Sequence, residues 1–333
     1  MMYNLDQPLS FLDPGPSEYL PLKDEPFFNA ELHLALEMPN ETISLSDLGY
    51  GEDILSVCDS SFGLSNAFRV LSDEGVAAMI DVCRQIYKNR NDDTGTGDNR
   101  LGSYARGAGY RSKFIRDFCD SPELAEHVSK ISGVSLIRHS VPAVACGINY
   151  APDDINKAID SWHVDSVSYD MVMMVSDPCE LKGGEFQAFL GTKEQGQELL
   201  GIQGEEGINR DLPQERIRTI EFPAAGYGFL QQGNMIFHRA CRLLEKAERI
   251  TMIPSFELAS ATANDMTNSV NMSSWTDPGM LPELARFEMK RASARLLSLV
   301  DELNVSESPK EITNKIEHAL HALNAFTENL NAK

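Results

Sequence analysis

The sequence predicts a mostly β core with flanking helices, and three observations support this. Short runs of β-forming and apolar residues fill the middle of the chain, glycines separate several of them, and helix-periodic segments lie on both sides. The expected strands cover residues 169–175, 183–190, 226–232, 234–238 and 248–253. The expected helices cover residues 72–89, 121–133, 281–303 and 310–330.

The boundaries of these helices follow from capping and periodicity. Ser72-Asp73-Glu74 and Ser121-Pro122-Glu123 are typical helix starts, and Gly133 is a typical helix end. Thr192 followed by Gln195 has the form of a capping box, so another short helix is expected there. The last expected helix has an apolar stripe formed by Ile312, Ile316, Leu320 and Leu323.

A chain of 333 residues suits one catalytic domain with additions at each end. We expect an acidic, proline-containing N-terminal extension over residues 1–64, a catalytic domain with buttressing helices over 65–258, and a C-terminal helical extension over 259–333. The sequence does not decide whether the first part is an ordered wrap or partly loose. The insertion at 191–216 contains a glycine-rich, polar stretch from Gly201 to Gln214, and we expect the insertion to close over substrate as a lid.

The charge, the hydrophobic runs and the cysteines of the chain indicate which binding partners and which cellular location to expect. A net charge of −21 would repel a polyanion, so we expect a small-molecule substrate and no nucleic acid. No apolar run is long enough to span a bilayer, and the first residues lack the features of a signal peptide, so no membrane partner is expected. The cysteines are scattered singly, which predicts reduced thiols in a cytoplasmic protein: Cys58, Cys83, Cys119, Cys146, Cys179 and Cys241.

The residues most informative about function are His163, Asp165 and His238. On an extended segment the side chains of His163 and Asp165 leave the same face, so both can reach one ion. Two imidazoles and one carboxylate are the ligand set of a non-haem iron(II) centre, which keeps three coordination positions open for co-substrate and dioxygen. The pattern therefore predicts a catalytic metal site.

Arg249 and Thr251 lie on one face of an expected strand that follows His238. A guanidinium binds a carboxylate through two parallel hydrogen bonds, and a threonine hydroxyl can contact the same oxygens. These two residues are therefore a candidate site for a dicarboxylate.

Together these motifs resemble the iron(II)/2-oxoglutarate-dependent dioxygenases. The first motif is similar to that of the phytanoyl-CoA hydroxylase-like branch, and the last to the Arg-x-Ser pattern of plant-type oxygenases. The resemblance covers about residues 134–256. The motifs that carry it are Trp162-His163-Val164-Asp165, Gly183-Gly184-Glu185, Gly233 to His238-Arg239 and Glu248-Arg249-Ile250-Thr251.

The resemblance implies a double-stranded β-helix, the jelly-roll or cupin-like barrel. It implies that His163, Asp165 and His238 ligate Fe(II), that O2 binds beside them, and that Arg249 and Thr251 bind the distal carboxylate of 2-oxoglutarate. Additional co-substrate contacts are expected from Asn149 and Tyr150. Iron halogenases of this superfamily have a small residue in place of the carboxylate, so Asp165 favours hydroxylation.

Substrate contacts are expected from a loop that gathers arginine and tyrosine between glycines. We expect Arg106 or Arg111 to bind a substrate carboxylate, with Tyr104 and Trp162 as further contacts. The alternative is a loop whose arginines offset neighbouring acids. An amino acid, or a metabolite derived from one, is the expected substrate class.

Several alternatives stay open at this point. The same centre could catalyse desaturation or cyclisation, and a non-catalytic cupin-like protein would have the same barrel. A zinc hydrolase would need a general base near the metal, for which Glu185 is the obvious candidate. The C-terminal helices could pack on the outer sheet or form the interface of a homodimer.

Overall fold

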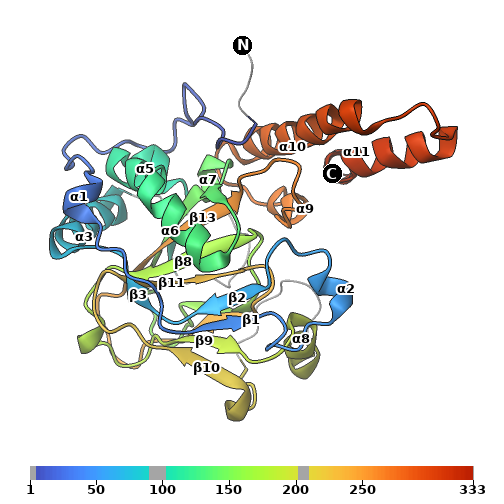
Figure 1. Cartoon of the computed structure of the whole chain (residues 1–333). Coiled ribbons are helices and arrows are strands. Elements are labelled where there is room, and N and C mark those ends of the chain that lie inside the picture. Colours follow the sequence, from blue (N-terminus) through green and yellow to red (C-terminus); the bar gives the residue numbers. More distant parts are fainter. Residues whose placement is uncertain (1–4, 90–102, 202–209, 333) are drawn as a thin grey trace.

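The strands form two antiparallel sheets in the computed structural model, which describes residues 5–89, 103–201 and 210–332 (Figure 1). The larger sheet has the order β1 (Thr42–Ser44), β2 (Phe62–Ser65), β11 (Tyr227–Gln231), β8 (Tyr169–Met174), β13 (Ile250–Leu258), β6 (Cys146–Tyr150) and β4 (Tyr104–Ala105), while β3 (Phe68–Arg69) pairs with β11 and β5 (Leu136–Arg138) with β13. The smaller sheet has the order β10 (Ile217–Ile220), β9 (Phe186–Phe189), β12 (His238–Ala240) and β7 (Asp160–His163).

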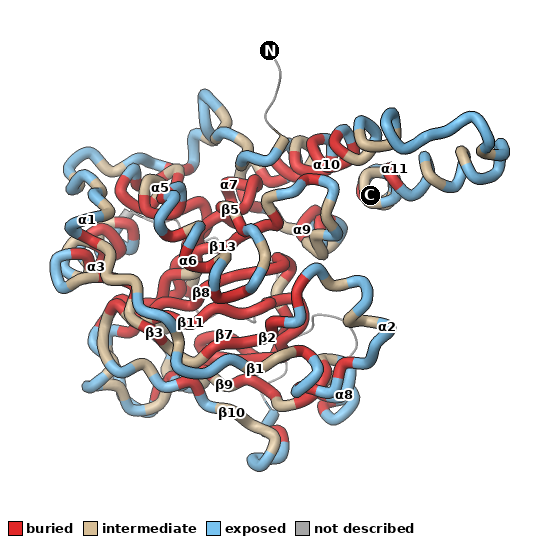
Figure 2. Tube along the Cα trace, in the orientation of Figure 1, coloured by how far each residue is buried: buried red, intermediate tan, exposed pale blue. Residues whose placement is uncertain are grey.

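The two sheets pack face to face around a buried apolar core. Val172 and Phe229 of the larger sheet pack in one cluster with Phe186, Ala188 and Ile220 of the smaller sheet. Figure 2 shows the central strands as the most continuously buried part of the chain. The expected β core with a jelly-roll architecture is therefore confirmed.

Helices cover the outer face of the larger sheet and extend from one end of it. A second apolar core joins that face to α3 (Asp73–Asn89), α5 (Lys113–Cys119) and α6 (Pro122–Ser132). The other helices are α1 (Ala30–His33), α2 (Glu52–Leu55), α4 (Ala108–Arg111), α7 (Pro142–Ala145), α8 (Lys193–Leu200), α9 (Ser269–Met272), α10 (Met280–Glu302) and α11 (Pro309–Asn331), with 3-10 turns at Pro178–Glu180 and Gln214–Arg216.

The expected helices are confirmed together with their caps. The hydroxyl of Ser121 accepts a hydrogen bond from the Leu124 amide at the start of α6, and Gly133 ends that helix with a φ of +75°. The hydroxyl of Thr192 accepts from the Gln195 amide at the start of α8. These short polar side chains satisfy amide groups that lack a partner within the helix.

One expected strand is wrong. Residues 234–238 do not form a strand, because a turn over Gly233 to Met235 carries the chain from one sheet to the other. His238 therefore begins β12 instead of ending a strand. The chain returns to the larger sheet after β12, so β13, which follows Arg249, lies in the opposite sheet from β12.

The expected boundary at residue 64 does not separate an extension from the barrel. β1 and β2 belong to the larger sheet, and Leu64 of β2 pairs with Gln231 of β11. From residue 5 to these strands the chain is an ordered segment that wraps around the helices. The amide of Leu22 donates to the Arg111 carbonyl, and Lys290 donates to the Gln7 carbonyl.

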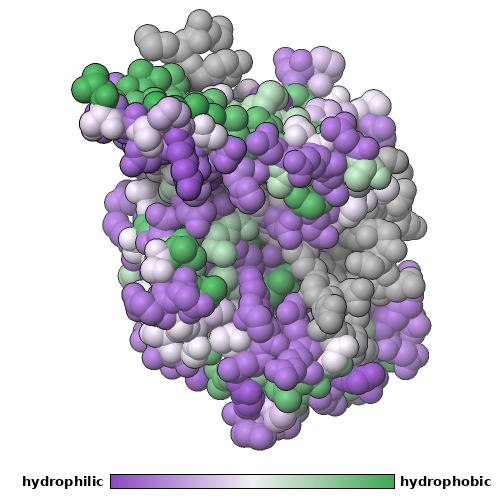
Figure 3. All heavy atoms as spheres, turned by 90° about the vertical axis from the view of Figure 1, so that its right-hand side faces the viewer, coloured by the Kyte–Doolittle hydropathy of each residue, from purple (hydrophilic) through white to green (hydrophobic). Residues whose placement is uncertain are grey.

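α10 and α11 form a hairpin that projects from the body of the molecule (Figure 1). Its base packs on the body through Met280, Leu284 and Phe287. Figure 3 shows hydrophobic residues gathered near the top of the face it draws, the level at which the hairpin projects. The large hydrophobic residues exposed on the hairpin are Leu281, Met289, Leu296, Leu297, Val300, Leu303, Val305 and Ile316. Pairing of two copies through these helices stays a prediction.

Two further observations bear on the expected cytoplasmic location. In the described ranges, no helix combines the length and the apolar character needed to cross a bilayer. All six cysteines lie within those ranges, and each is a free thiol. A cytoplasmic location stays a prediction.

A buried glutamate at the base of α10 should make stability depend on pH. Burial raises the pKa of Glu283 to about 7, although hydrogen bonds from the Tyr110 hydroxyl and the Ala143 amide oppose the rise. Between the ordinary value of 4.5 and about 7, the native state keeps a proton that the unfolded chain has lost. The stability from this proton is complete below about pH 4.5 and is lost as the pH rises through 7.

We expect Glu283→Gln, which cannot ionise, to remove this part of the pH dependence. The free energy of unfolding of the variant, relative to wild type, should rise between pH 5 and pH 8 by up to about 3 kcal/mol. Urea unfolding at a series of pH values measures this difference. A difference that stays constant with pH would show that Glu283 does not titrate in this range.

Candidate active site

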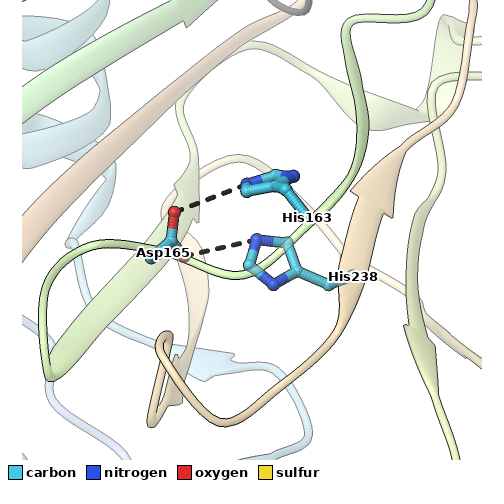
Figure 4. Close-up of side chains that lie close together, drawn as sticks. All are labelled: His163, Asp165 and His238. Carbon is cyan, nitrogen blue, oxygen red and sulfur yellow. Dashed lines mark ion pairs between the residues drawn. The ribbon is translucent and has the colours of Figure 1, made fainter. Parts of the chain in front are cut away.

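The three candidate ligands meet at one end of the barrel, between the sheets (Figure 4). His163 ends β7, His238 begins β12, and the two residues pair directly across these strands. Asp165 lies two residues beyond β7, where its amide donates to the Gly233 carbonyl. The Asp165 carboxylate oxygens lie 3.4 Å from Nε2 of His163 and 3.3 Å from Nε2 of His238. One ligand atom from each residue lies within 4.8 Å of the others.

Backbone carbonyls orient both imidazoles. Nδ1 of His163 lies 2.6 Å from the Ser161 carbonyl, and Nδ1 of His238 lies 2.9 Å from the Ile236 carbonyl. Because a carbonyl can only accept, Nδ1 is the donor in both rings, and Nε2 is the nitrogen that faces Asp165 and would bind a metal.

The donor set fits a divalent metal. Two imidazole nitrogens and one carboxylate converge on one point, as a 2-His-1-carboxylate iron(II) site requires. Glu185, the base that a zinc hydrolase would need, is exposed and does not line the cavity. The ligand set therefore fits iron(II) and gives no support to the hydrolase alternative.

Arg249 approaches the same cavity from the larger sheet and is only 1% exposed. Its Nε donates to the Gly184 carbonyl at 2.9 Å, and its Nη1 lies 3.4 Å from the Thr251 hydroxyl. Burial lowers its pKa to about 10, and among the described residues no carboxylate forms an ion pair with it. A buried guanidinium without an ion-pair partner is a candidate binding site for an anionic ligand.

The Gly183–Gly184 turn allows this approach. Both glycines have a φ of +78°, a conformation that other residues rarely adopt. A Cβ atom on Gly184 would lie 3.0 Å from Cδ of Arg249. The glycine turn noted in the sequence thus makes room for the arginine.

Of the two expected additional co-substrate contacts, only Asn149 lines the cavity. Its Oδ1 is buried and accepts no hydrogen bond within the described structure. Tyr150 follows it on β6 and therefore points to the opposite face, where its hydroxyl donates to the Cys83 carbonyl of α3. Tyr150 is a structural residue in this arrangement.

Of the four expected substrate contacts, two line the cavity and two do not. Tyr104 and Arg106 line the cavity, and the Arg106 guanidinium lies 3.7 Å from the centre of the Trp275 ring. Arg111 lies behind the cavity wall, where its guanidinium stacks on the ring of Tyr19. Trp162 is fully buried outside the cavity and donates to the Arg210 carbonyl.

Comparison with known proteins assigns the family. The halogenase D family model matches residues 77–276, which is more than half of the chain. The chain belongs to the halogenase D family. This membership confirms the resemblance to iron(II)/2-oxoglutarate-dependent enzymes at the level of the superfamily.

Solved structures show a more distant likeness, and no curated protein matches the chain. The epimerase SnoN from nogalamycin biosynthesis is 14% identical, with a TM-score of 0.42 over 58% of this chain and 78% of its own. The carbocyclase SnoK from the same pathway is 15% identical, with a TM-score of 0.40 over 65% and 87%. A Pseudomonas putida prolyl-4-hydroxylase is 14% identical, with a TM-score of 0.39 over 64% and 97%.

Several cavity residues of this halogenase D family member were not expected from the sequence. Asp160 lines the cavity, and its Oδ2 lies 3.5 Å from Nε2 of His163. Asp170 is fully buried in β8, and burial, reinforced by the neighbouring Asp165, raises the pKa of its carboxyl well above the ordinary range. Trp275 comes from the segment after β13, which reads as a polar connection. Two features of the sequence could have pointed to these residues: Asp170 is an acid inside an apolar run, and Trp275 is a lone tryptophan in a polar segment.

The expected lid at 191–216 stays a prediction. Its residues 202–209 lie outside the described residues, and the described remainder contributes none of the cavity-lining side chains. Arg210 and Leu212 instead pack near Trp162 on the outer side of the smaller sheet. The cavity wall opposite the barrel includes Asn271, Ser274 and Trp275.

Proposed function

We propose that this protein is an iron(II)- and 2-oxoglutarate-dependent oxygenase that hydroxylates a C–H bond of a small molecule, such as an amino acid or a metabolite derived from one. The convergence of His163, Asp165 and His238 opposite the buried Arg249 carries this proposal. When bound, iron(II) with 2-oxoglutarate and O2 supplies the oxidising power to cleave an unactivated C–H bond, with succinate and CO2 as co-products.

Asp165 supports hydroxylation over halogenation within a family named for a halogenase. A halogenating iron centre needs a coordination position for a halide where an oxygenase has its carboxylate. In this chain the carboxylate is present and lies between the two imidazoles. We infer that Asp165 occupies the position that a halide would need.

The co-substrate would be held mainly by the larger sheet. Arg249 and Thr251 suit the distal carboxylate of 2-oxoglutarate, because they present a guanidinium and a hydroxyl on one buried face. Asn149 lies beside Thr251 across the β6–β13 pair and offers a further polar contact. Burial of these groups excludes water and strengthens their interaction with an anion.

The remaining space supports a small, charged substrate. The cavity has a volume of about 240 Å³, which must hold both 2-oxoglutarate and the substrate. Arg106 forms an ion pair with the buried Asp277, with its Nε 3.3 Å from Oδ2, and its guanidinium lies against the ring of Trp275. We infer that its remaining nitrogens bind a substrate carboxylate, because the ion pair and the ring contact hold the guanidinium in place. Asp160 offers a carboxylate to an amino group on the same substrate. Charges of both signs on one small cavity favour a zwitterion, as an amino acid is.

Succinate release with a panel of amino acids tests this proposal. We expect at least one amino acid to stimulate succinate release and to gain one oxygen atom by mass spectrometry. For that substrate, Arg106→Gln should raise KM by at least about tenfold with little change in the KM for 2-oxoglutarate, since a hydrogen bond to a charged group contributes about 1.5–3 kcal/mol. Arg111→Gln, the matched control behind the cavity wall, should leave KM for the substrate nearly unchanged.

The alternatives from the sequence remain distinguishable by the same assay. Desaturation would remove two hydrogen atoms from the substrate, and cyclisation would form a ring in it, in both cases without adding oxygen. A non-catalytic binding protein would bind ligand and release no succinate. If the substrate stimulates succinate release but gains no oxygen, the proposed use of iron(II) and 2-oxoglutarate stands and the proposed hydroxylation is wrong.

A further inference from the structure

A buried carboxamide connects the metal-ligand carboxylate to a second acid. Nε2 of Gln231, on β11, donates to Oδ2 of Asp165 at 3.2 Å and to Oδ1 of Asp170 at 2.9 Å. Gln231 and Asp170 are both 0% exposed, and they are direct partners in the β11–β8 pairing. The sheet register therefore fixes the position of the carboxamide relative to Asp170.

Gly233 closes the other side of this cluster. A Cβ atom at this position would lie 2.0 Å from Oδ2 of Asp170, 2.8 Å from Oδ2 of Asp165 and 2.9 Å from Cβ of Asp165. The Gly233 carbonyl also accepts the amide of Asp165. A Cβ atom would collide with both acids, so a glycine at this position lets the chain pass close to them while its carbonyl holds the Asp165 backbone.

We propose that Gln231 is the positioning residue that holds Oδ2 of Asp165 and thereby leaves Oδ1 as the ligand atom. This inference rests on the proposed function. A carboxylate that used both oxygens as ligands would occupy a coordination position that a 2-His-1-carboxylate site keeps open for co-substrate and O2. A hydrogen bond to one oxygen opposes that arrangement, and residues that orient ligands in this way contribute strongly to metal affinity.

The chain offers a matched control at the next residue. Gln232 is also buried, but its Nε2 donates to the carbonyls of Ser60 and Phe62 and lies 3.1 Å from the Tyr169 hydroxyl. It has no hydrogen bond to any candidate metal ligand among the contacts that the structure describes. Gln231→Met and Gln232→Met each replace a buried carboxamide with an unbranched side chain of similar size.

The experiment is a competition titration with Fe(II) under anaerobic conditions, followed by the visible spectrum of the Co(II)-loaded proteins. We expect Gln231→Met to weaken Fe(II) binding by about 10- to 100-fold and to change the Co(II) bands. Gln232→Met should bind Fe(II) within about twofold of wild type and keep the Co(II) spectrum, even if its melting temperature falls. Equal Fe(II) affinities and identical Co(II) spectra for wild type and Gln231→Met would overturn the inference.

The same titration distinguishes a failure of the proposed function from a failure of the role assigned to Gln231. Failure of wild type to bind Fe(II) would contradict the proposed function, whereas binding by wild type and Gln231→Met alike would contradict only the role of Gln231. If Gln231→Met does not fold, the side-chain amide of Gln231 in the Zn(II)-loaded wild type gives the answer by NMR. Its signals should shift on metal binding and exchange slowly with solvent, and the absence of a shift would overturn the inference.

Discussion

Asp165→Ala is expected to lower substrate-dependent hydroxylation by at least about 100-fold. Loss of a residue that merely orients a ligand already costs about 10- to 100-fold in metal affinity or activity, so loss of the ligand itself should cost more. Asp165 also lies between both imidazoles, and its removal leaves the two histidines as the remaining members of the described metal-binding group. Oxygen incorporation and Fe(II) affinity, measured with the variant, test this.

Asp211→Ala is the matched control, because Asp211 forms an ion pair with Arg239 away from the cavity and is largely exposed. Its activity should stay within about twofold of wild type. Chlorinated product from Asp165→Ala in the presence of chloride would support the inference that this carboxylate selects oxygen transfer. Hydroxylation by Asp165→Ala at the wild-type rate would show that Asp165 is not a ligand.

Arg249→Ala is expected to weaken 2-oxoglutarate binding from about 30-fold to a few thousand-fold. Truncating one partner of a buried, hydrogen-bonded charge pair costs about 2–5 kcal/mol. The guanidinium is almost fully buried, so water cannot replace it easily. The dissociation constant of 2-oxoglutarate for the Fe(II)-loaded variant, measured without O2, gives the loss directly.

Arg239→Ala provides the comparison for this second variant. Arg239 is also a buried arginine, but it contacts Gln187, Asp211 and the ring of Trp162 outside the cavity. We expect it to leave the affinity for 2-oxoglutarate unchanged even if it lowers stability. Equal losses in both arginine variants would mean that Arg249 acts through folding and not through the co-substrate.

Much of the site could be predicted because its chemistry is concentrated in short motifs. His163, Asp165 and His238 converge, and Arg249 and Thr251 share a face, as their residue types and spacing indicated. Helix periodicity and capping residues likewise predicted the long helices close to their observed ends. Such features are local, so a single sequence carries them.

The remaining features depend on which strands meet in space. The turn at Gly233 moves the chain from one sheet to the other, and nothing in its apolar flanks distinguishes that crossing from a hairpin. Tyr150 points away from the cavity because side chains alternate along β6, and Gln231 meets Asp170 through the pairing of β11 with β8. β1 and β2 join the sheet from a segment rich in proline and acids, where composition gave no sign of a strand.

The most direct test of the whole account is anaerobic titration of the wild-type protein with Fe(II) and then 2-oxoglutarate. The convergence of two imidazoles, one carboxylate and a buried guanidinium predicts a weak visible charge-transfer band that appears only when both are bound and fades on exposure to O2. His238→Ala should lose the band. A wild-type protein that binds Fe(II) and 2-oxoglutarate without producing this band, or that binds neither, would contradict the account.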